Sequence, residues 1–176
     1  MKRSAAIEWL ARALAIFGGL VLVAITLLTV ASITGRAFVR QGLGPVPGDF
    51  ELVEAMTAFA VFSFLPWCQL RGGHATVDVF TSFFPDSVNR IIDLVSEVLM
   101  SLVITLIAWR LWYGMQDKIR YNETTFILQF PVWWGFAAAM VAVVVAVIVS
   151  WYMSFIRVQE VMAGRRQFGP AEGGHS

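Results

Sequence analysis

Long apolar runs separated by short polar connections dominate the pattern of this sequence. Uncharged runs extend over residues 13–35, 55–70, 98–109 and 124–156. A helix of about 20 apolar residues is long enough to cross the hydrocarbon core of a bilayer. With the start and stop signals near their ends, these runs predict an all-α integral membrane protein with four transmembrane helices, at approximately 13–35, 50–70, 91–113 and 132–154.

Charged residues and prolines set the expected limits of the second and third helices. The second should begin near residue 50, because Glu51 and Glu54 then lie at the positive end of the helix macrodipole. Pro66 should kink or end this helix, since proline has no backbone N–H to donate. The third helix should start at residues 85–87, where a proline precedes two short polar side chains, and continue to about Met115.

The last uncharged run is longer than one upright span requires, so part of it should precede the helix. Pro131 is a suitable first-turn residue. Aromatic pairs at 133–134 and 151–152 would lie about 27 Å apart along a helix, which places one pair at each membrane interface. Residues 124–130 are therefore predicted to be an interfacial lead-in, held by the protein if it enters the lipid.

The connection after the second helix contains both polar groups and an apolar face. Gly72 and Gly73 should form a turn, and apolar side chains then recur at spacings of three and four, at Val77, Phe80, Phe83 and Phe84. This spacing predicts a short interfacial amphipathic helix between helices two and three. The polar groups of this connection are Arg71, His74 and Asp78. They have two interpretations. They either contact lipid headgroups and helix ends, or they form a polar corner that fixes an interhelical angle or docks a partner.

Composition agrees with a membrane protein and excludes several classes of function. Hydrophobic residues make up 58% of the chain and charged residues 14%, with a net charge of +1, so no basic surface for nucleic acid is expected. A single cysteine excludes a thiol oxidoreductase that exchanges disulfides. The two histidines, His74 and His175, lie outside the spans and cannot serve as axial haem ligands within them.

The centres of the four predicted spans contain no ionisable residue. Membrane proteins that transport ions or catalyse reactions usually retain such residues in their spans, because burying them is costly. Common hydrolase, zinc and nucleotide-binding motifs are also absent. We therefore expect no catalytic, cofactor-binding, metal-binding or substrate-binding residues, and predict that the chain acts by supporting a partner.

Acidic residues at the start of the second span have two interpretations. Glu51 and Glu54 share one helix face, because they are three residues apart. They either favour the helix start through its macrodipole, or pair with Arg36 or Arg40 across the first connection.

Two further acids, Asp93 and Glu97, lie one turn apart in the third helix, and Glu97 is the acid expected to be most buried. They either form an interfacial face paired with Arg90, or contact a polar groove on another subunit. Glu97 is thus a candidate for a structural or partner contact.

The basic residues outside the apolar centres divide unequally between the two sides of the membrane. Those on the side of the N-terminus are Lys2, Arg3, Arg12, Arg71, Arg90, Arg157, Arg165 and Arg166. Those on the other side are Arg36, Arg40, Arg110, Lys118 and Arg120. Because Lys and Arg are enriched on the cytoplasmic side, both termini are predicted to be cytoplasmic. Residues 1–163 would form the membrane domain and residues 164–176 a flexible tail.

The chain resembles the small membrane subunit of tripartite ATP-independent periplasmic (TRAP) transporters, the DctQ-like family. The residues that match the family pattern are Gly35-Arg36 at the end of the first helix, Glu51-Leu52 at the start of the second, Arg71, His74, Val77 and Asp78 after it, Pro85, and Pro131 with Trp133. Alanines at 137–139 stand where the family pattern has a proline.

This resemblance implies a three-part importer of the bacterial inner membrane. A soluble periplasmic protein captures an organic acid, such as a dicarboxylate, and a large membrane subunit moves it with sodium. The small subunit braces the scaffold of the large one and helps to form the docking surface for the binding protein. By this resemblance Arg36, Arg40, Glu51 and Glu54 lie near the periplasmic face and are docking candidates, whereas Arg71, His74 and Asp78 lie on the cytoplasmic side. The alternative hypothesis is a membrane anchor subunit of a redox enzyme complex.

Overall fold

The computed structural model describes residues 5–71 and 86–163. Its elements are helix α1 (Ala5–Ala37), a short 3-10 helix η1 (Val39–Gln41), and helices α2 (Asp49–Leu70), α4 (Asp86–Arg120) and α5 (Trp133–Ala163). No strand occurs in these residues, and the only extended pairing is an isolated bridge between Thr124 and Pro131. Four helices are long and apolar enough to cross a membrane, which confirms the predicted all-helical membrane fold.

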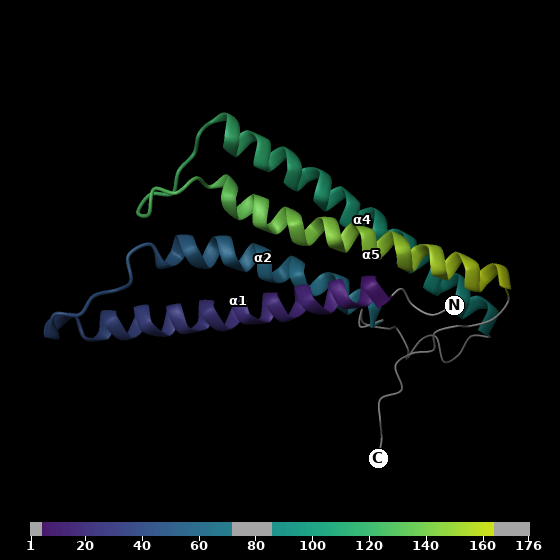
Figure 1. Ribbon diagram of the computed structural model, residues 1–176, viewed down its shortest axis with the longest axis horizontal. Helices are drawn as coiled ribbons and strands as arrows, with labels where there is room; N and C mark the ends of the chain where they lie inside the picture. The colour runs from purple at the N-terminus through teal and green to yellow at the C-terminus, as the bar shows by residue number, and fades with distance from the viewer. Residues whose placement is uncertain (1–4, 72–85, 164–176) are drawn as a thin grey trace, which may run out of the picture.

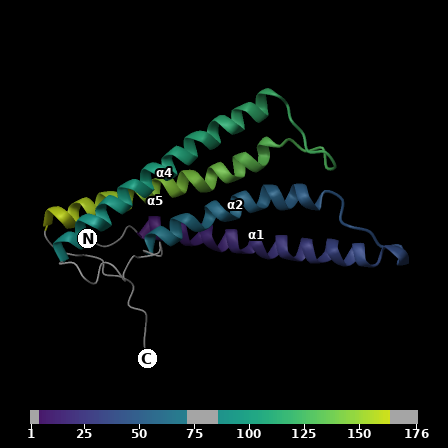
Figure 2. The ribbon, with the colours of Figure 1, turned by 180° about the vertical axis from the view of Figure 1, so that it is seen from behind.

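The four long helices form an open row. Helix α1 packs on α2, α2 packs on α5, and α5 packs on α4, while α1 touches α5 only slightly. Figures 1 and 2, which view the protein from opposite sides, both show this order, with α1 and α4 at the two edges. Because the row is one helix thick, each helix leaves apolar surface that the other described helices do not cover.

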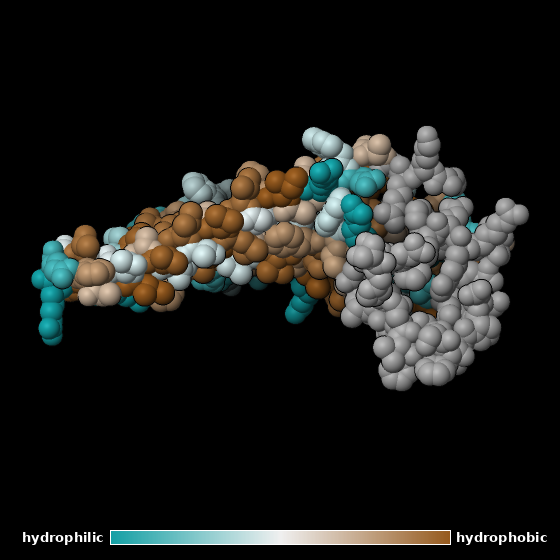
Figure 3. All heavy atoms as spheres, turned by 90° about the horizontal axis from the view of Figure 1, so that it is seen from below, coloured by the Kyte–Doolittle hydropathy of each residue, from teal (hydrophilic) through white to brown (hydrophobic). Residues whose placement is uncertain are grey.

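Exposed apolar side chains follow the two edge helices at spacings of three and four residues. On α4 they are Ile91, Val95, Leu99, Leu102, Leu106, Trp109 and Tyr113. On α1 they are Ile16, Leu20, Val23, Leu27 and Val30. Figure 3 shows apolar side chains along the length of the helices. Such faces are compatible with lipid or with another membrane helix, and incompatible with water.

Small residues on α5 allow it to occupy the middle of the row. Ala139, Ala142, Val143, Ala146 and Val149 are buried on this helix. Small side chains let neighbouring helix backbones approach closely, which strengthens packing where no hydrophobic effect drives helices together. Helix α5 can therefore contact α2 on one side and α4 on the other.

The limits of the second helix agree with the predicted span, and those of two other helices differ from expectation. Helix α2 begins at Asp49, as the first-turn acids indicated, and ends at Leu70, as the predicted span 50–70 did. Of the two expectations for Pro66, the one that it ends the helix near Trp67 was wrong, because the helix continues through it. Proline lacks only its own backbone N–H, so the helix loses one hydrogen bond at Pro66 and the last turn can still form. Helix α4 starts at Asp86, as predicted, and extends beyond Met115 to Arg120, because no Gly or Pro follows until after the turn at Asn122, where φ is 48°. Helix α1 begins eight residues before the predicted span, at Ala5.

The amphipathic helix predicted between helices two and three lies outside the described residues. The same holds for His74 and Asp78, and for the tail at 164–176. These predictions remain as the sequence states them.

Candidate docking site

Two connections lie at the same end of the helix row, opposite the N-terminus (Figure 1). They are residues 38–48, between α1 and α2, and residues 121–132, between α4 and α5. We call this end of the row the loop end. Three sets of contacts join the connections to the helices there and give the loop end a defined shape.

The first set centres on Asp49, the first residue of α2. Arg36, in the last turn of α1, donates a hydrogen bond to Asp49 Oδ2 at 2.8 Å, and the hydroxyl of the buried Ser32 donates to the same oxygen. The second carboxylate oxygen accepts the backbone N–H of Phe50 at 2.9 Å. The Arg36 guanidinium also lies 5.3 Å from the centre of the Phe50 ring. One carboxylate therefore fastens the end of α1 to the start of α2.

Gly35 lies directly against the first connection. A Cβ atom at this position would lie 2.1 Å from the carbonyl oxygen of Gly44, far closer than two such atoms can approach. The Gly35-Arg36 pair thus has a physical explanation: glycine admits the connection, and the arginine beside it reaches Asp49.

Replacing Gly35 by alanine should displace the first connection and lower the free energy of unfolding by about 1–3 kcal/mol, the usual cost of overpacking. Gly19→Ala is a matched control, because a Cβ on this glycine of the same helix would meet nothing within 4 Å. The control should be neutral or slightly stabilising. Thermal unfolding of the two variants in detergent, followed by circular dichroism, checks this. Equal midpoints for the two variants would contradict the close approach.

The second set joins α2 to the connection between α4 and α5. The Glu51 carboxylate accepts the backbone N–H of Ile127 at 2.6 Å and that of Leu128 at 2.9 Å. The Leu128 side chain covers Gly48, where a Cβ would lie 2.4 Å from Leu128 Cγ and where φ is 73°. A carboxylate that accepts two backbone amides holds a loop more firmly than a neutral acceptor does.

The tip of this connection is both fixed and exposed. Thr125 N donates to the carbonyl of Phe130 at 2.9 Å, and Phe130 N donates to the Thr125 hydroxyl at 3.2 Å. Between them, Phe126 is 94% exposed. This agrees with the expected lead-in held by protein contacts, and it presents an aromatic ring on a fixed loop.

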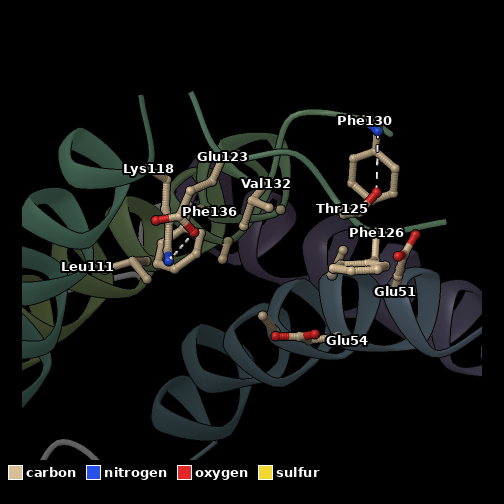
Figure 4. A pocket seen from close by; sticks show the side chains of 14 residues that line it. Glu51, Glu54, Leu111, Lys118, Glu123, Thr125, Phe126, Phe130, Val132 and Phe136 are labelled. Atoms are coloured by element: carbon tan, nitrogen blue, oxygen red, sulfur yellow. Dashed lines mark hydrogen bonds and ion pairs between the residues drawn. The ribbon is translucent and has the colours of Figure 1, made fainter. Parts of the chain in front are cut away.

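The third set borders a cavity of about 510 Å³ between α2, α4, α5 and the second connection. Lys118, near the end of α4, donates to Glu123 at 2.6 Å on one side of the cavity. Figure 4 shows Glu54 on α2, across the cavity from that ion pair, and Glu51 on the same helix, one turn nearer its start. The mouth of the cavity thus combines three carboxylates with one ammonium group.

The first-turn acids Glu51 and Glu54 do not pair with Arg36 or Arg40 in the described residues. Arg36 pairs with Asp49, a residue that the sequence did not single out, because Asp49 lies at the start of α2 beside the end of α1. Glu51 binds the second connection instead. In the part of the chain that the structure describes, neither Arg40 nor Glu54 has an ion pair or side-chain hydrogen bond, and both are exposed.

Residues 25–160 match the family model of the tripartite ATP-independent periplasmic transporters, DctQ component. The chain belongs to the DctQ family. It is therefore a TRAP transporter component and a multi-pass membrane protein. Comparisons with curated proteins and with solved structures gave no significant match.

In this DctQ chain, Glu97 lies in a polar cluster that joins three helices. Gln69 on α2 donates to Glu97 Oε1 at 2.6 Å, and the Ser150 hydroxyl on α5 donates to Gln69 Oε1 at 2.5 Å. Ser101 and Ser154 hydrogen-bond each other at 2.8 Å next to the Glu97 carbonyl. Glu97 thus points toward α2 and α5 within the chain. Its partners were hard to find from the sequence, because Gln69, Ser101 and Ser154 stand there only as isolated polar residues within apolar runs.

Arg71 is the last described residue before the connection that contains His74 and Asp78. Its guanidinium lies 4.6 Å from the centre of the Trp67 ring, on the preceding turn of α2. This cation–π contact holds the arginine beside its own helix at the end opposite the loop end. Whether Arg71, His74 and Asp78 form a corner stays a prediction.

Within residues 5–71 and 86–163, no three His, Cys, Asp or Glu side chains converge as metal ligands would. The contacts at the loop end and the Glu97 cluster consist of hydrogen bonds and ion pairs between the chain's own residues. Such clusters can hold helices and loops in place and present a surface to a partner.

Proposed function

We propose that this DctQ chain is the non-catalytic small subunit of a sodium-coupled TRAP transporter that imports an organic acid, a dicarboxylate or a related carboxylate. A periplasmic binding protein delivers the substrate, and a large membrane subunit moves it. The family match over most of the chain is the observation on which this proposal rests. It favours the transporter over a membrane anchor for a redox enzyme.

The open row of helices supports the proposal that the chain braces the large subunit. A one-helix-thick row has two broad faces, and its edge helices α1 and α4 keep stripes of exposed apolar side chains. Close packing against another apolar helix surface would cover such stripes by van der Waals contact. We propose that the large subunit scaffold covers part of this surface and that lipid covers the rest.

We propose that the binding protein docks at the loop end. Exposed charges there include Arg40 and Glu54, and the Asp49 and Glu51 contacts fix the connections that border them. A surface fixed in advance loses less conformational freedom on binding than a loose one, so it binds more tightly for the same contacts. Arg36, Arg40, Glu51 and Glu54 remain the proposed docking residues.

Recovery of the partner tests the assembly directly. Purification of the tagged chain from native membranes in mild detergent should yield a much larger hydrophobic protein in one-to-one ratio. The complex should show no haem or flavin absorption band. A monodisperse chain without a partner, or a haem or flavin absorption band in the purified complex, would contradict the proposal.

We further propose an inner-membrane location with both termini cytoplasmic and the loop end periplasmic, based on the excess of Lys and Arg on the side of the termini. In a Cys68→Ser background, a cysteine placed at the exposed Gln41 should react with a membrane-impermeant thiol reagent in spheroplasts. A cysteine at the exposed Ala6, at the opposite end, should react only after the membrane is broken. The reverse labelling pattern would overturn the orientation.

A further inference from the structure

The walls of the loop-end cavity change from polar to apolar with depth along the helices. Its charged residues lie close to the helix ends: by helix rise, Glu54 is about 8 Å from the start of α2 and Lys118 about 3 Å from the end of α4. Apolar lining continues deeper, to about 14 Å at Ala58 and Leu111. This gradient matches the passage from headgroups to hydrocarbon at a membrane surface.

Glu54 is the carboxylate at the cavity mouth whose side chain has no partner among the described residues. Glu51 already accepts two backbone N–H groups, and Glu123 accepts from Lys118. Among the described residues Glu54 has neither a hydrogen bond nor an ion pair, and it is exposed. Lys118 uses one of its three ammonium donors on Glu123. The mouth therefore offers a carboxylate acceptor on one side and ammonium donors on the other (Figure 4).

We propose that this cavity binds one phospholipid with a primary ammonium headgroup, phosphatidylethanolamine. Its ammonium group donates hydrogen bonds to the Glu54 carboxylate, and its phosphate accepts from Lys118. Three carboxylates against one ammonium give the mouth a net negative charge, which opposes an anionic lipid such as phosphatidylglycerol. The quaternary ammonium of phosphatidylcholine has no N–H to donate, so it cannot make the Glu54 hydrogen bonds.

The deeper part of the cavity suits the start of an acyl chain. Leu111, Phe136 and Ala139 line it, and the volume of about 510 Å³ lies in the range of about 300–1,000 Å³ for pockets that hold small organic molecules. At hydrocarbon depth, an unfilled space would leave its apolar lining without dispersion contacts. Figures 1 and 2 show the α1–α2 pair and the α4–α5 pair separating toward this end. A lipid placed here fixes the angle between the two pairs, whatever substrate the transporter moves.

Native mass spectrometry of the purified full chain, titrated with each lipid, tests the proposal. The first bound phosphatidylethanolamine should have an apparent Kd about tenfold lower than that of phosphatidylcholine or phosphatidylglycerol, as expected for charge-assisted hydrogen bonds. Glu54→Gln should remove this preference. Asp117→Asn is the matched control, because Asp117 is an exposed acid at the same end that does not line the cavity. Its lipid preference should be unchanged.

A photoactivatable phosphatidylethanolamine locates the bound lipid independently of affinity. Cross-links should map to cavity-lining residues of α2 and α5, among them Glu54, Ala55, Ala58, Gly135, Phe136 and Ala139. Equal affinities for the three lipids would overturn the proposal, as would a Glu54→Gln variant with unchanged preference. Cross-links confined to the exposed stripe of α4, or a basic side chain of the large subunit cross-linked to Glu54 in a lipid-free cavity, would overturn it as well.

Discussion

Replacing Glu51 by alanine should loosen the connection between α4 and α5 while leaving the four helices in place. The substitution removes the acceptor of the Ile127 and Leu128 backbone N–H groups. Hydrogen bonds to a charged group contribute about 1.5–3 kcal/mol, so hydrogen exchange at these two amides should become about 10 to 100 times faster. Exchange measured by mass spectrometry on the detergent-solubilised protein checks this, and the far-ultraviolet circular dichroism should not change.

Glu54→Gln is the control for this prediction. It changes an acid one turn further along the same helix, at the border of the same cavity, but one that makes no hydrogen bond to the second connection in the described residues. Exchange at Ile127 and Leu128 should stay at the wild-type rate. If Glu54→Gln accelerates this exchange as much as Glu51→Ala does, the loop is held by the net charge of the cavity mouth and not by the two hydrogen bonds.

A loosened second connection should also weaken docking in the proposed transporter. Phe126, the exposed ring at the tip, would no longer be presented in one position, and the partner would have to order the loop on binding. In reconstituted transport, Glu51→Ala should therefore raise the concentration of binding protein needed for half-maximal uptake more than it lowers the maximal rate. An unchanged half-maximal concentration would show that the order of this connection does not affect docking.

The helices of this protein were largely predictable, because apolar runs of sufficient length have few alternatives. The start of α2 followed from Glu51 and Glu54, which only a helix beginning near Asp49 places in the first turns. The end of α4 was less predictable. Residues 116–120 contain no helix breaker, so the helix continues past the aromatic residues that mark the membrane interface. Apolarity defines where a helix crosses a membrane, whereas backbone chemistry defines where it stops.

The contacts at the loop end could not be predicted in the same way. Glu51 binds backbone amides 76 and 77 residues away, and backbone amides have no residue identity that a sequence pattern could reveal. Asp49 was overlooked because an acid in a first turn already has a local explanation in the helix macrodipole. The lateral order of the helices, with α5 between α2 and α4, depends on the close packing of small residues and on long-range contacts. Hydrophobic periodicity contains no information about either of these.

Substitution in the polar cluster around Glu97 should lower the thermal stability of the whole protein, whereas substitution at Glu51 should loosen only one connection. Gln69→Leu removes the donor to Glu97 Oε1 and the acceptor of the Ser150 hydroxyl, at a position that is 1% exposed. Glu97 is half-buried, so loss of its partner should cost part of the penalty for an unpaired buried group, which is about 1–3 kcal/mol and larger for a charged group. The thermal midpoint of the purified protein should therefore fall by several degrees. Gln116→Leu is the control, since this half-buried glutamine on α4 has no hydrogen bond in the described residues.

The double variant Gln69→Leu/Glu97→Leu distinguishes a cost of unpaired polarity from a loss of helix packing. When both partners become apolar, no unpaired carboxylate remains between the helices, and such replacements are often close to neutral. The double variant should therefore unfold at a higher temperature than Gln69→Leu alone, although it has one more substitution. If its midpoint lies below that of the single variant, Glu97 stabilises the row through contacts other than Gln69, such as its Coulombic attraction to Arg157.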